Sequence, residues 1–431
     1  MRKKIAVDVA IVGGGIIGCA TAWYLTQRGL SVALFEKGTV AGEQSGRNSG
    51  FVRKQGRDER EMPLIKRSLD LWRDIDKQIE GETGFTVAGN LAVAGDEAKL
   101  AAMHSWLAVA KEFGVGSEIL TNGRLQDVCP RIRRGFLGAL YTPTDARAEP
   151  ELAAPAIAAA LRRKGAEVHE NCHVQELELS GGRVTGLVTE KFDVKARTVV
   201  VAAGLWSYIF LKRYGVFVPQ SDLKISVGRT APFDHGMTIP SWTPDVLVRP
   251  RHDGGLTIAL GMTRAADFEL TSRSLRVAGR FLPTYLMNRR GVSIGVNGRF
   301  FENNRWSSAY LSSDPARYSE IRVPHVPPNV AELEKGTRFA RTDFQFDPPI
   351  RLVDSWACRV DLTPDGIPVI GETLPGLVVA TGMSGHGFGL SLGVGDSVAE
   401  LIDRGSTTIA LDAFDPGRFR HRYFAAPQNV L

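Results

Sequence analysis

The sequence predicts an α/β fold: a Rossmann-like dinucleotide-binding domain with an inserted α+β substrate domain that holds a large mixed sheet. Two observations near the N-terminus lead to the first part. An apolar run at residues 9–12 enters Gly13-x-Gly15-x-x-Gly18, and a helical pattern follows it. A second apolar run, residues 31–35, ends on Glu36. The third observation is the alternating, strand-like pattern of residues 216–346, which predicts the inserted sheet.

Each residue of the glycine pattern has a physical reason. Gly13 permits a sharp turn off the strand, Gly15 lets the backbone approach a pyrophosphate, and Gly18 lets the helix pack closely on the sheet. The start of that helix offers N–H groups and a positive dipole end to phosphates. Glu36 can accept hydrogen bonds from two ribose hydroxyls and would repel a 2′-phosphate, which argues against NADP.

The same stretch also resembles a signal peptide or membrane anchor, because residues 5–25 are mostly apolar and follow the basic residues 2–4. Asp8 and the glycines interrupt the run, whereas a spanning helix needs about 20 apolar residues. We therefore expect no membrane span and a cytoplasmic protein. The 4 cysteines show neither disulfide nor zinc-site spacing, which fits a reducing compartment and no bound metal.

Length and charge limit the remaining possibilities. With 431 residues, 43% of them hydrophobic, the chain can bury a large core and is long enough for two domains. The net charge is +6, but the basic residues are dispersed among 47 acidic ones. Short basic clusters without interleaved aromatic residues are typical of solvated surface, so we expect no nucleic-acid partner.

Periodicity and turn residues predict the elements in order. After a glycine-bearing loop at 42–56, we expect a helix around 64–72, a helix near 97–113, a helix from Glu149-Pro150, the start of a strand at 165–169, a hairpin over 175–187 that turns at Gly181-Gly182, a strand at 198–203, strands at 222–230, 245–249 and 256–260, helical segments after 270 and around 329–338, a strand at 376–382, and a helix at about 391–402. The nucleotide domain is therefore expected to comprise residues 1–85, 147–215 and 350–431. Residues 86–146 and 216–349 would form the substrate domain.

Four motifs in this order resemble the flavoprotein superfamily of D-amino acid oxidase, glycine oxidase and monomeric sarcosine oxidase. They are the opening fingerprint, the strand and turn at 199–207 (Val-Val-Val-Ala-Ala-Gly-Leu-Trp-Ser), the segment 356–371 around Thr-Pro-Asp-Gly, and Thr-Gly-Met-Ser-Gly-His-Gly-Phe at 381–388. The resemblance implies that the nucleotide domain binds FAD, with the isoalloxazine ring between the two domains.

The resemblance also implies the residues that contact FAD. They are Gly13, Gly15, Ile16, Ile17, Gly18, Glu36, Lys37, Ser45, Gly46, Arg47, Asn48, Ser49, Gly50, Val174, Ala203, Gly204, Trp206, Cys358, Asp365, Gly385, His386, Gly387 and Phe388. Some of these have a plainer interpretation. Asp365 lies in a strong turn sequence whatever the function, and His386 could simply cap a helix or satisfy a core.

The family reaction takes a hydride from the carbon next to an amine nitrogen onto flavin N5, and the imine then hydrolyses. The resemblance therefore implies oxidation of an amine or secondary amino acid, with oxygen, a quinone or a protein as electron acceptor. Two alternatives stay open: dehydrogenation of a hydroxyacid or alcohol, and a role as the FAD-binding subunit of a larger amine or opine dehydrogenase. We place His386, Arg47 and Arg53 in the catalytic region, although both arginines could be solvated loop charges.

Two carboxylate-binding residues of related enzymes are missing here. Glycine-oxidase-like members have an arginine where this chain has Val360, and sarcosine-oxidase-like members have a lysine where it has Gly389. Arg359 is one residue away and should point to the opposite face of its strand. Another cation could bind a substrate anion, and the candidates are Arg47, Arg53, Arg249 and Arg251.

Cys358 occupies the position at which sarcosine-oxidase-like enzymes attach the flavin through sulfur. A neighbouring cation such as Arg359 would lower the pKa of the thiol and favour this bond. A buried cysteine that only fills space is the usual alternative. We therefore expect non-covalent FAD with Cys358 close to the ring, and a covalent link at Cys358 as the alternative.

Overall fold

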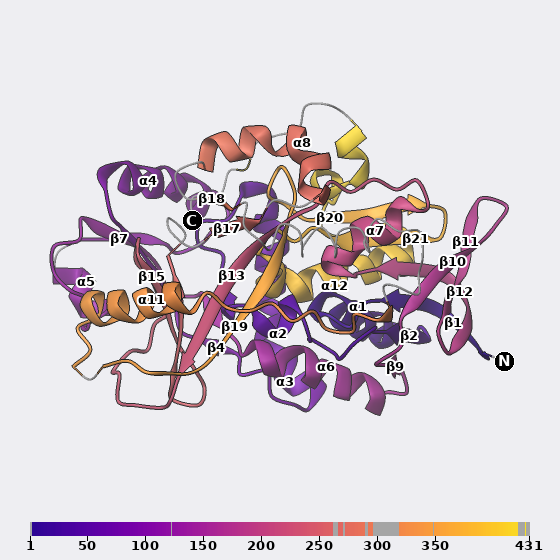
Figure 1. Ribbon diagram of the computed structural model, residues 1–431, viewed down its shortest axis with the longest axis horizontal. Coiled ribbons are helices and arrows are strands. Elements are labelled where there is room, and N and C mark those ends of the chain that lie inside the picture. Colours follow the sequence, from indigo (N-terminus) through magenta and orange to yellow (C-terminus); the bar gives the residue numbers. More distant parts are fainter. Residues whose placement is uncertain are drawn as a thin grey trace.

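The computed structural model describes residues 2–121, 123–261, 266–269, 272–288, 292–295, 319–347, 349–420 and 427. Within these residues the strands form an eight-stranded, a ten-stranded and a three-stranded sheet. The first two sheets occupy opposite ends of the molecule, with β10–β12 at one end and β7 near the other (Figure 1). This arrangement confirms the expected α/β fold with a second, mixed sheet. Parts of the inserted segment 216–349 lie outside the described residues.

The eight-stranded sheet contains the strands of the predicted nucleotide-binding unit. Its strands are β1 (Lys3–Val12), β2 (Val32–Phe35), β9 (Glu167–His169), β10 (Val174–Ser180), β11 (Arg183–Thr189), β12 (Phe192–Val201), β20 (Val369–Leu374) and β21 (Leu377–Thr381). Strands β9, β2, β1, β12 and β21 are parallel neighbours in that order. Val12 is in register with both Phe35 and Val201, so the carboxyl ends of three strands meet at one edge, where ligands bind in such sheets.

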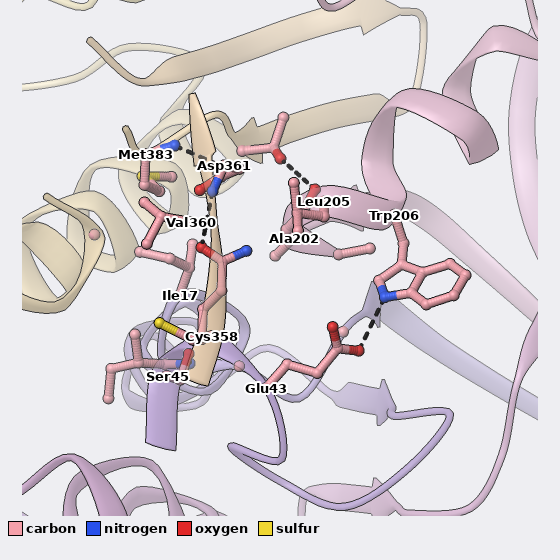
Figure 2. A pocket seen from close by; sticks show the side chains of 18 of the residues that line it. Ile17, Glu43, Ser45, Ala202, Leu205, Trp206, Cys358, Val360, Asp361 and Met383 are labelled. Atoms are coloured by element: carbon pink, nitrogen blue, oxygen red, sulfur yellow. Dashed lines mark hydrogen bonds between the residues drawn. The ribbon is translucent and has the colours of Figure 1, made fainter. Parts of the chain in front are cut away.

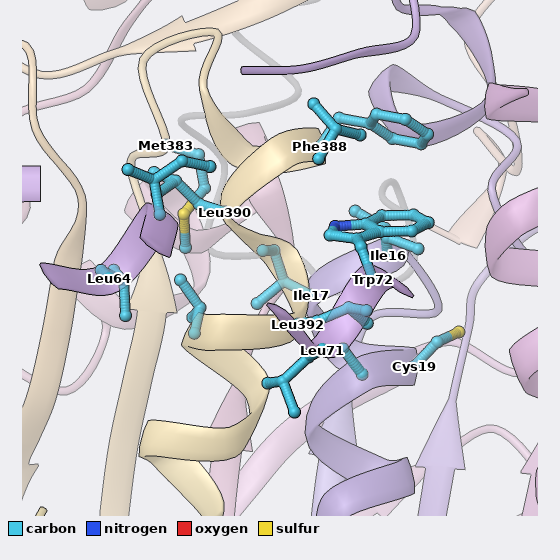
Figure 3. Close-up of a cluster of buried hydrophobic side chains, with 14 of the residues drawn as sticks. Ile16, Ile17, Cys19, Leu64, Leu71, Trp72, Met383, Phe388, Leu390 and Leu392 are labelled. Carbon is cyan, nitrogen blue, oxygen red and sulfur yellow. The ribbon is translucent and has the colours of Figure 1, made fainter. Parts of the chain in front are cut away.

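Four helices pack on one another beside this sheet: α1 (Ile16–Gln27), α3 (Met62–Ile79), α6 (Pro150–Arg163) and α12 (Gly387–Arg404). The first ten residues of α1 are all buried, because the helix is covered by the sheet and by α6 and α12. Figure 3 shows the resulting core, where Ile17 of α1, Trp72 of α3 and Leu392 of α12 come together. This core packs α1, and with it the glycine turn at its start, against the sheet.

The ten-stranded sheet is mixed. Its strands are β5 (Asn90–Ala94), β6 (Glu118–Leu120), β7 (Gly138–Thr142), β13 (Ser221–Thr230), β14 (Ser241–Trp242), β15 (Val246–Pro250), β16 (Leu256–Leu260), β17 (Ala266–Glu269), β18 (Val292–Gly295) and β19 (Leu352–Leu362). Most pairs are antiparallel, but β14 runs parallel to β5 and β17 parallel to β18. Strand β19 pairs with β13 over nearly its whole length, although its sequence was assigned to the nucleotide domain. The limits of the nucleotide and substrate domains given above remain a proposal, in which β19 is the strand that connects the two domains.

The remaining elements are short or peripheral. They are the three-stranded sheet of β3 (Phe51–Val52), β4 (Thr86–Val87) and β8 (Ala146–Arg147), the helices α2 (Gln44–Arg47), α4 (Glu97–Glu112), α5 (Gly123–Val128), α7 (Ser207–Lys212), α8 (Ser272–Asn288) and α11 (Val330–Asp343), and the 3-10 helices η1 (Glu59–Glu61), η2 (Gly204–Trp206), η3 (Asp412–Phe414) and η4 (Pro416–Arg420). The predicted hairpin is present as β10–β11. Helix α12 begins four residues earlier than its apolar pattern indicated, at Gly387. Among the described residues, no helix is both long and apolar enough to cross a membrane.

Candidate active site

A cavity of about 350 Å³ lies between the two large sheets. One wall comes from the carboxyl ends of β1, β2, β12 and β21, and the other from β13 and β19. Figure 2 shows this convergence: Ile17, Ala202 and Cys358 come from three distant parts of the chain. The cavity therefore joins the predicted nucleotide edge to the sheet of the inserted segment.

The glycine turn has the geometry that the fingerprint predicts. Gly13 has φ +109°, and a Cβ there would lie 2.5 Å from the Ala202 carbonyl oxygen. A Cβ at Gly18 would lie 2.0 Å from the Gly13 carbonyl oxygen, so α1 packs directly on the turn. Gly15 is the N-cap of α1 and lines the cavity with Ile16 and Ile17. The positive end of this helix therefore faces a space that an anion can enter.

Glu36 braces both sides of this turn. Its carboxylate accepts the Gly14 N–H at 2.8 Å through one oxygen and the Gly38 N–H at 2.7 Å through the other. Burial raises the pKa of Glu36, while these two backbone bonds oppose the rise. A carboxylate has about four acceptor sites, so it can still accept ribose hydroxyls from the cavity that it lines.

The loop that follows β2 forms the floor of the cavity. Ser45 Oγ accepts the Ile16 N–H at 2.9 Å, and Asn48 bonds to the Ser45 carbonyl at 2.8 Å and to the Gly50 N–H at 2.8 Å. Ser45, Asn48, Ser49 and Gly50 line the cavity as expected. Gly46 does not; a Cβ there would lie 2.4 Å from the Ala41 carbonyl oxygen.

Arg47 is not brought to the cavity. Its guanidinium donates to the Pro324 carbonyl at 3.2 Å, and its own carbonyl accepts the Trp356 indole N–H at 2.9 Å. The guanidinium is therefore held at Pro324, and Arg47 is not among the residues that line the cavity.

At the far end of the cavity, Trp206, Lys37 and Glu43 form a cluster. The Trp206 indole N–H donates to Glu43 at 2.9 Å, as Figure 2 shows, and the Lys37 ammonium lies 3.2 Å from the same carboxylate oxygen. The Lys37 ammonium also sits 3.0 Å from the centre of the Trp206 ring. Val174, Ala203 and Gly204 line the cavity too. Glu43 was missed, because an acid in a polar loop gives no local signal.

The opposite end of the cavity holds a buried cluster of charges. Arg53, Arg57 and His386 line it, and Glu61 lies directly behind. The exposed fractions are 7% for Arg53, 3% for Arg57 and 0% for Glu61. His386 Nδ1 is 3.0 Å from the Glu61 carboxylate, and Arg57 Nη1 is 4.0 Å from it. Arg57 and Glu61 were not predicted, since nothing local separates them from neighbouring surface charges.

Burial is the main influence on these groups. Burial, together with repulsion from Arg57, lowers the pKa of Arg53 to about 9. The guanidinium therefore stays charged at neutral pH. Burial also lowers the pKa of His386, assisted by Arg57 and opposed by Glu61. The histidine is therefore mainly neutral between two guanidiniums and one carboxylate.

The profile of the FAD dependent oxidoreductase family, DAO, matches residues 8–401. The chain belongs to this family. It is 26% identical over 420 residues to the glycine oxidase of Geobacillus kaustophilus, which covers 94% of this chain and 96% of that protein. It is 28% identical over 271 residues to the sarcosine oxidase subunit beta of Arthrobacter sp, covering 61% of this chain and 67% of that subunit.

Other relatives are longer or show the fold alone. The 4-methylaminobutanoate oxidase (formaldehyde-forming) of Paenarthrobacter nicotinovorans is 26% identical over 419 residues, and the chain spans 46% of its length. The L-amino acid deaminase from Proteus myxofaciens, solved with anthranilate, superimposes with a TM-score of 0.89 at 24% identity, covering 98% of this chain and 95% of that one. As a DAO-family member, the chain is an FAD-dependent oxidoreductase.

The residues present fit FAD. The helix start at Gly15 suits the diphosphate, and Glu36 suits a ribose. The cavity continues from there past Cys358 to Gly385, His386, Gly387 and Phe388, where the second sheet adds an apolar wall for a flat ring. Most of the predicted FAD contacts line this cavity. The exceptions are Gly18, Gly46, Arg47 and Asp365. Gly18 acts through packing.

Asp365 is explained by turn chemistry. The Gly366 N–H donates to the Thr363 carbonyl at 3.2 Å, which closes the turn. The Asp365 carboxylate pairs with Arg418 at 2.7 Å instead of facing the cavity. A nearby acid, Asp361, does line the cavity, and its carboxylate accepts the Met383 N–H at 3.2 Å and the Gln220 amide N–H at 3.1 Å.

Arg249 and Arg251 are not brought to the cavity either. Arg249 is wholly buried and holds Glu149 with two bonds of 2.9 Å. Arg251 pairs with Glu151 and, at 3.2 Å, with Asp253. Of the four arginines considered for a substrate anion, only Arg53 lines the cavity.

Cys358 lines the cavity, but its surroundings do not favour a thiolate. Burial raises the pKa of the thiol to about 12, and Arg47 opposes this only weakly. Arg359 is not the neighbouring cation that the sequence suggested. It points to the other face of β19, as strand alternation requires, and pairs with Asp222 at 2.7 Å. Val360 lines the cavity, so no cation replaces the arginine that glycine-oxidase-like members have there.

Proposed function

We propose that this protein oxidises the carbon–nitrogen bond of an amine that also carries a single carboxylate, such as a secondary amino acid. The carbon next to nitrogen loses a hydride, the nitrogen loses a proton, and water then hydrolyses the imine to a carbonyl compound and an amine. FAD, when bound, supplies the two-electron acceptor for this hydride. Oxygen, a quinone or a protein would reoxidise it, since the relatives include both oxidases and dehydrogenases.

The observation that carries this proposal is the buried cation at the wall of the cavity. Arg53 and Arg57 face one carboxylate, Glu61. The nearby Asp145 does not cancel the remaining charge, because it is 3.9 Å from the Lys54 ammonium and accepts two backbone N–H groups. One positive charge is left over in a poorly hydrated place, where a guanidinium binds carboxylate strongly.

The remaining residues support a small organic substrate. The rings of Phe51 and Trp242, which line the cavity, lie 4.8 Å apart and are tilted by 52°, and the Arg53 guanidinium lies 5.5 Å from the centre of the Trp242 ring. Leu223, Ile225 and Val227 of β13 add apolar surface. Apolar walls beside the fixed positive charge of Arg53 would orient the substrate's carbon–hydrogen bond and exclude water.

The experiment is anaerobic mixing of the holoenzyme with a panel of compounds, followed by the loss of the flavin's visible absorbance. The panel pairs sarcosine and proline with matching amines that lack the carboxylate, and with 2-hydroxyacids. We expect bleaching by amino acids and none by hydroxyacids. Bleaching by hydroxyacids alone would overturn the proposal.

A variant of Arg53 tests the carboxylate contact directly. Arg53→Met removes the positive charge and keeps a side chain of similar length. We expect KM for the amino acid to rise at least about tenfold, which corresponds to a loss of about 1.4 kcal/mol in binding free energy. Arg47→Met is the matched control from the same loop, and its KM should stay near wild type. An unchanged KM in Arg53→Met would show that the substrate's carboxylate binds elsewhere.

The sarcosine oxidase subunit beta among the relatives favours a second candidate: the chain could act as the FAD-binding subunit of a larger assembly. Purified alone, it would then bind FAD but bleach only when a co-purified subunit is present. Size-exclusion chromatography with the same bleaching assay on each fraction separates the two cases.

A further inference from the structure

Glu61 is a fully buried carboxylate behind the wall of the cavity. It closes η1, and its neighbour Glu59 on the same turn is exposed. Burying a carboxylate costs free energy unless a partner compensates it. Here the partner that touches it is His386, at 3.0 Å, and Arg57 stands 4.0 Å away. The Glu61 carboxylate therefore lies closer to the His386 imidazole than to the Arg57 guanidinium.

This contact determines the tautomer of His386. An ionised carboxylate can only accept hydrogen bonds, and the Arg57 guanidinium lies 4.0 Å from this one. His386 Nδ1 must then carry the hydrogen, and Nε2 is the ring nitrogen that can take up a proton. His386 is the N-cap of α12, where the positive helix end disfavours an imidazolium, so the carboxylate is what makes a charged ring attainable.

An amino acid at neutral pH presents an ammonium group, whose nitrogen has no electron pair to assist loss of a hydride. We propose that Glu61 is a positioning residue that holds His386 with Nε2 ready to accept this ammonium proton. The N–H bond of the ammonium breaks and its electron pair stays on nitrogen, while the proton bonds to Nε2. The carboxylate then stabilises the imidazolium until solvent removes the proton. This inference rests on the proposed function.

Charged groups from several elements face His386. They are Glu61 from η1, with Arg57 and Arg53 from the segment before it. Behind Arg53 stands Asp145, beside β8, whose charge is offset by Lys54. Removing the Glu61 charge takes away a group that favours the charged ring, while Arg57 and Arg53 still oppose it, so protonation of His386 becomes harder.

The test compares Glu61→Gln, which keeps the shape and an acceptor, with the control Glu59→Gln. We expect the rate of anaerobic bleaching to fall about 10²-fold in Glu61→Gln, the lower end of what a positioned acid–base group contributes. FAD content should not change, and acetate, titrated against the flavin spectrum, should bind as tightly or more tightly, because a nearby negative charge is gone. The acidic limb of the rate profile should move to lower pH.

Two results would overturn the inference. One is a bleaching rate within twofold of wild type; the other is a joint loss of rate, FAD content and acetate binding, which indicates a structural role. Combining Glu61→Gln with His386→Asn should lower the bleaching rate no further than His386→Asn does alone.

NMR of the holoenzyme labelled with ¹⁵N-histidine determines the tautomer of His386 without any turnover. If His386 carries its hydrogen on Nε2, the inference is wrong even if no substrate is found. A panel in which no compound bleaches the flavin contradicts the proposed function only.

Discussion

Glu149 and Arg249, which are 100 residues apart in the chain, are joined by two hydrogen bonds of 2.9 Å in the interior. The pair connects the start of α6 with β15. A Cβ at Gly50 would lie 3.0 Å from the central guanidinium carbon of Arg249, so the pair stands directly behind a residue that lines the cavity. Arg249 therefore supports the cavity wall and does not contact what the cavity binds.

The first prediction follows from this pair. Arg249→Ala leaves Glu149 buried without its bidentate partner, and breaking a buried pair in this way costs about 3–5 kcal/mol. Urea unfolding of the holoenzyme should show a loss of this size. Arg276→Ala, on the exposed side of α8, is the control and should change the midpoint little. A loss below about 1 kcal/mol for Arg249→Ala would show that the pair contributes little.

The second prediction concerns the nucleotide turn. A Cβ at Gly15 would lie 3.0 Å from Ser45 Oγ, so Gly15→Val displaces the serine that holds the Ile16 N–H and fills the space for the diphosphate. The ratio of flavin to protein absorbance should fall strongly. Gly116→Val, where nothing lies within 4 Å of the added carbon, should retain full FAD. Normal flavin content in Gly15→Val would place the FAD site elsewhere.

The third prediction concerns how FAD is held. Because burial raises the pKa of Cys358 to about 12, almost no thiolate exists at neutral pH to attack the flavin. Acid precipitation should give a yellow supernatant and a colourless pellet. Flavin fluorescence that stays with the denatured chain, and disappears in Cys358→Ala, would instead demonstrate a covalent bond.

The fourth prediction concerns pH and stability. Burial lowers the pKa of His173 to about 4, whereas an unfolded histidine titrates near 6.5. Between these values the unfolded chain binds more protons than the folded one, so stability falls as the pH drops from about 6.5 to about 4. His173→Asn should lose less Tm over this range than wild type. The exposed His104→Asn should behave like wild type, and equal slopes for all three would rule out His173 as a contributor.

Much of the fold was predictable because it depends on neighbouring residues. The β1–α1–β2 unit, the β10–β11 hairpin and α12 follow from periodicity and from glycines at turns, which act within a few residues. The limits of the domains were harder. Strand β19 reads as part of the nucleotide unit, but its hydrogen bonds go to β13, and no local pattern specifies which distant strand an edge will pair with.

The candidate site divides in the same way. Gly13, Gly15 and Glu36 could be predicted from the sequence to lie at one turn because their spacing is local, and all three line the cavity. Arg47, Arg53 and Arg249 are chemically identical in the sequence, yet one donates to Pro324, one lines the cavity and one is bound to Glu149. A cation's role depends on which groups surround it after folding, since burial and partner charges set its free energy.

The FAD fingerprint, the order of the elements and the membership of the DAO family are thus written in local pattern, where each residue acts on its immediate neighbours. The contact between Glu61 and His386, which are 325 positions apart, and the burial of Arg53 and Arg57 beside it are properties of the folded structure. Only tertiary packing removes water from these groups. In the resulting low dielectric, the distances between their charges determine which ligand the cavity can bind and which group can take up a proton.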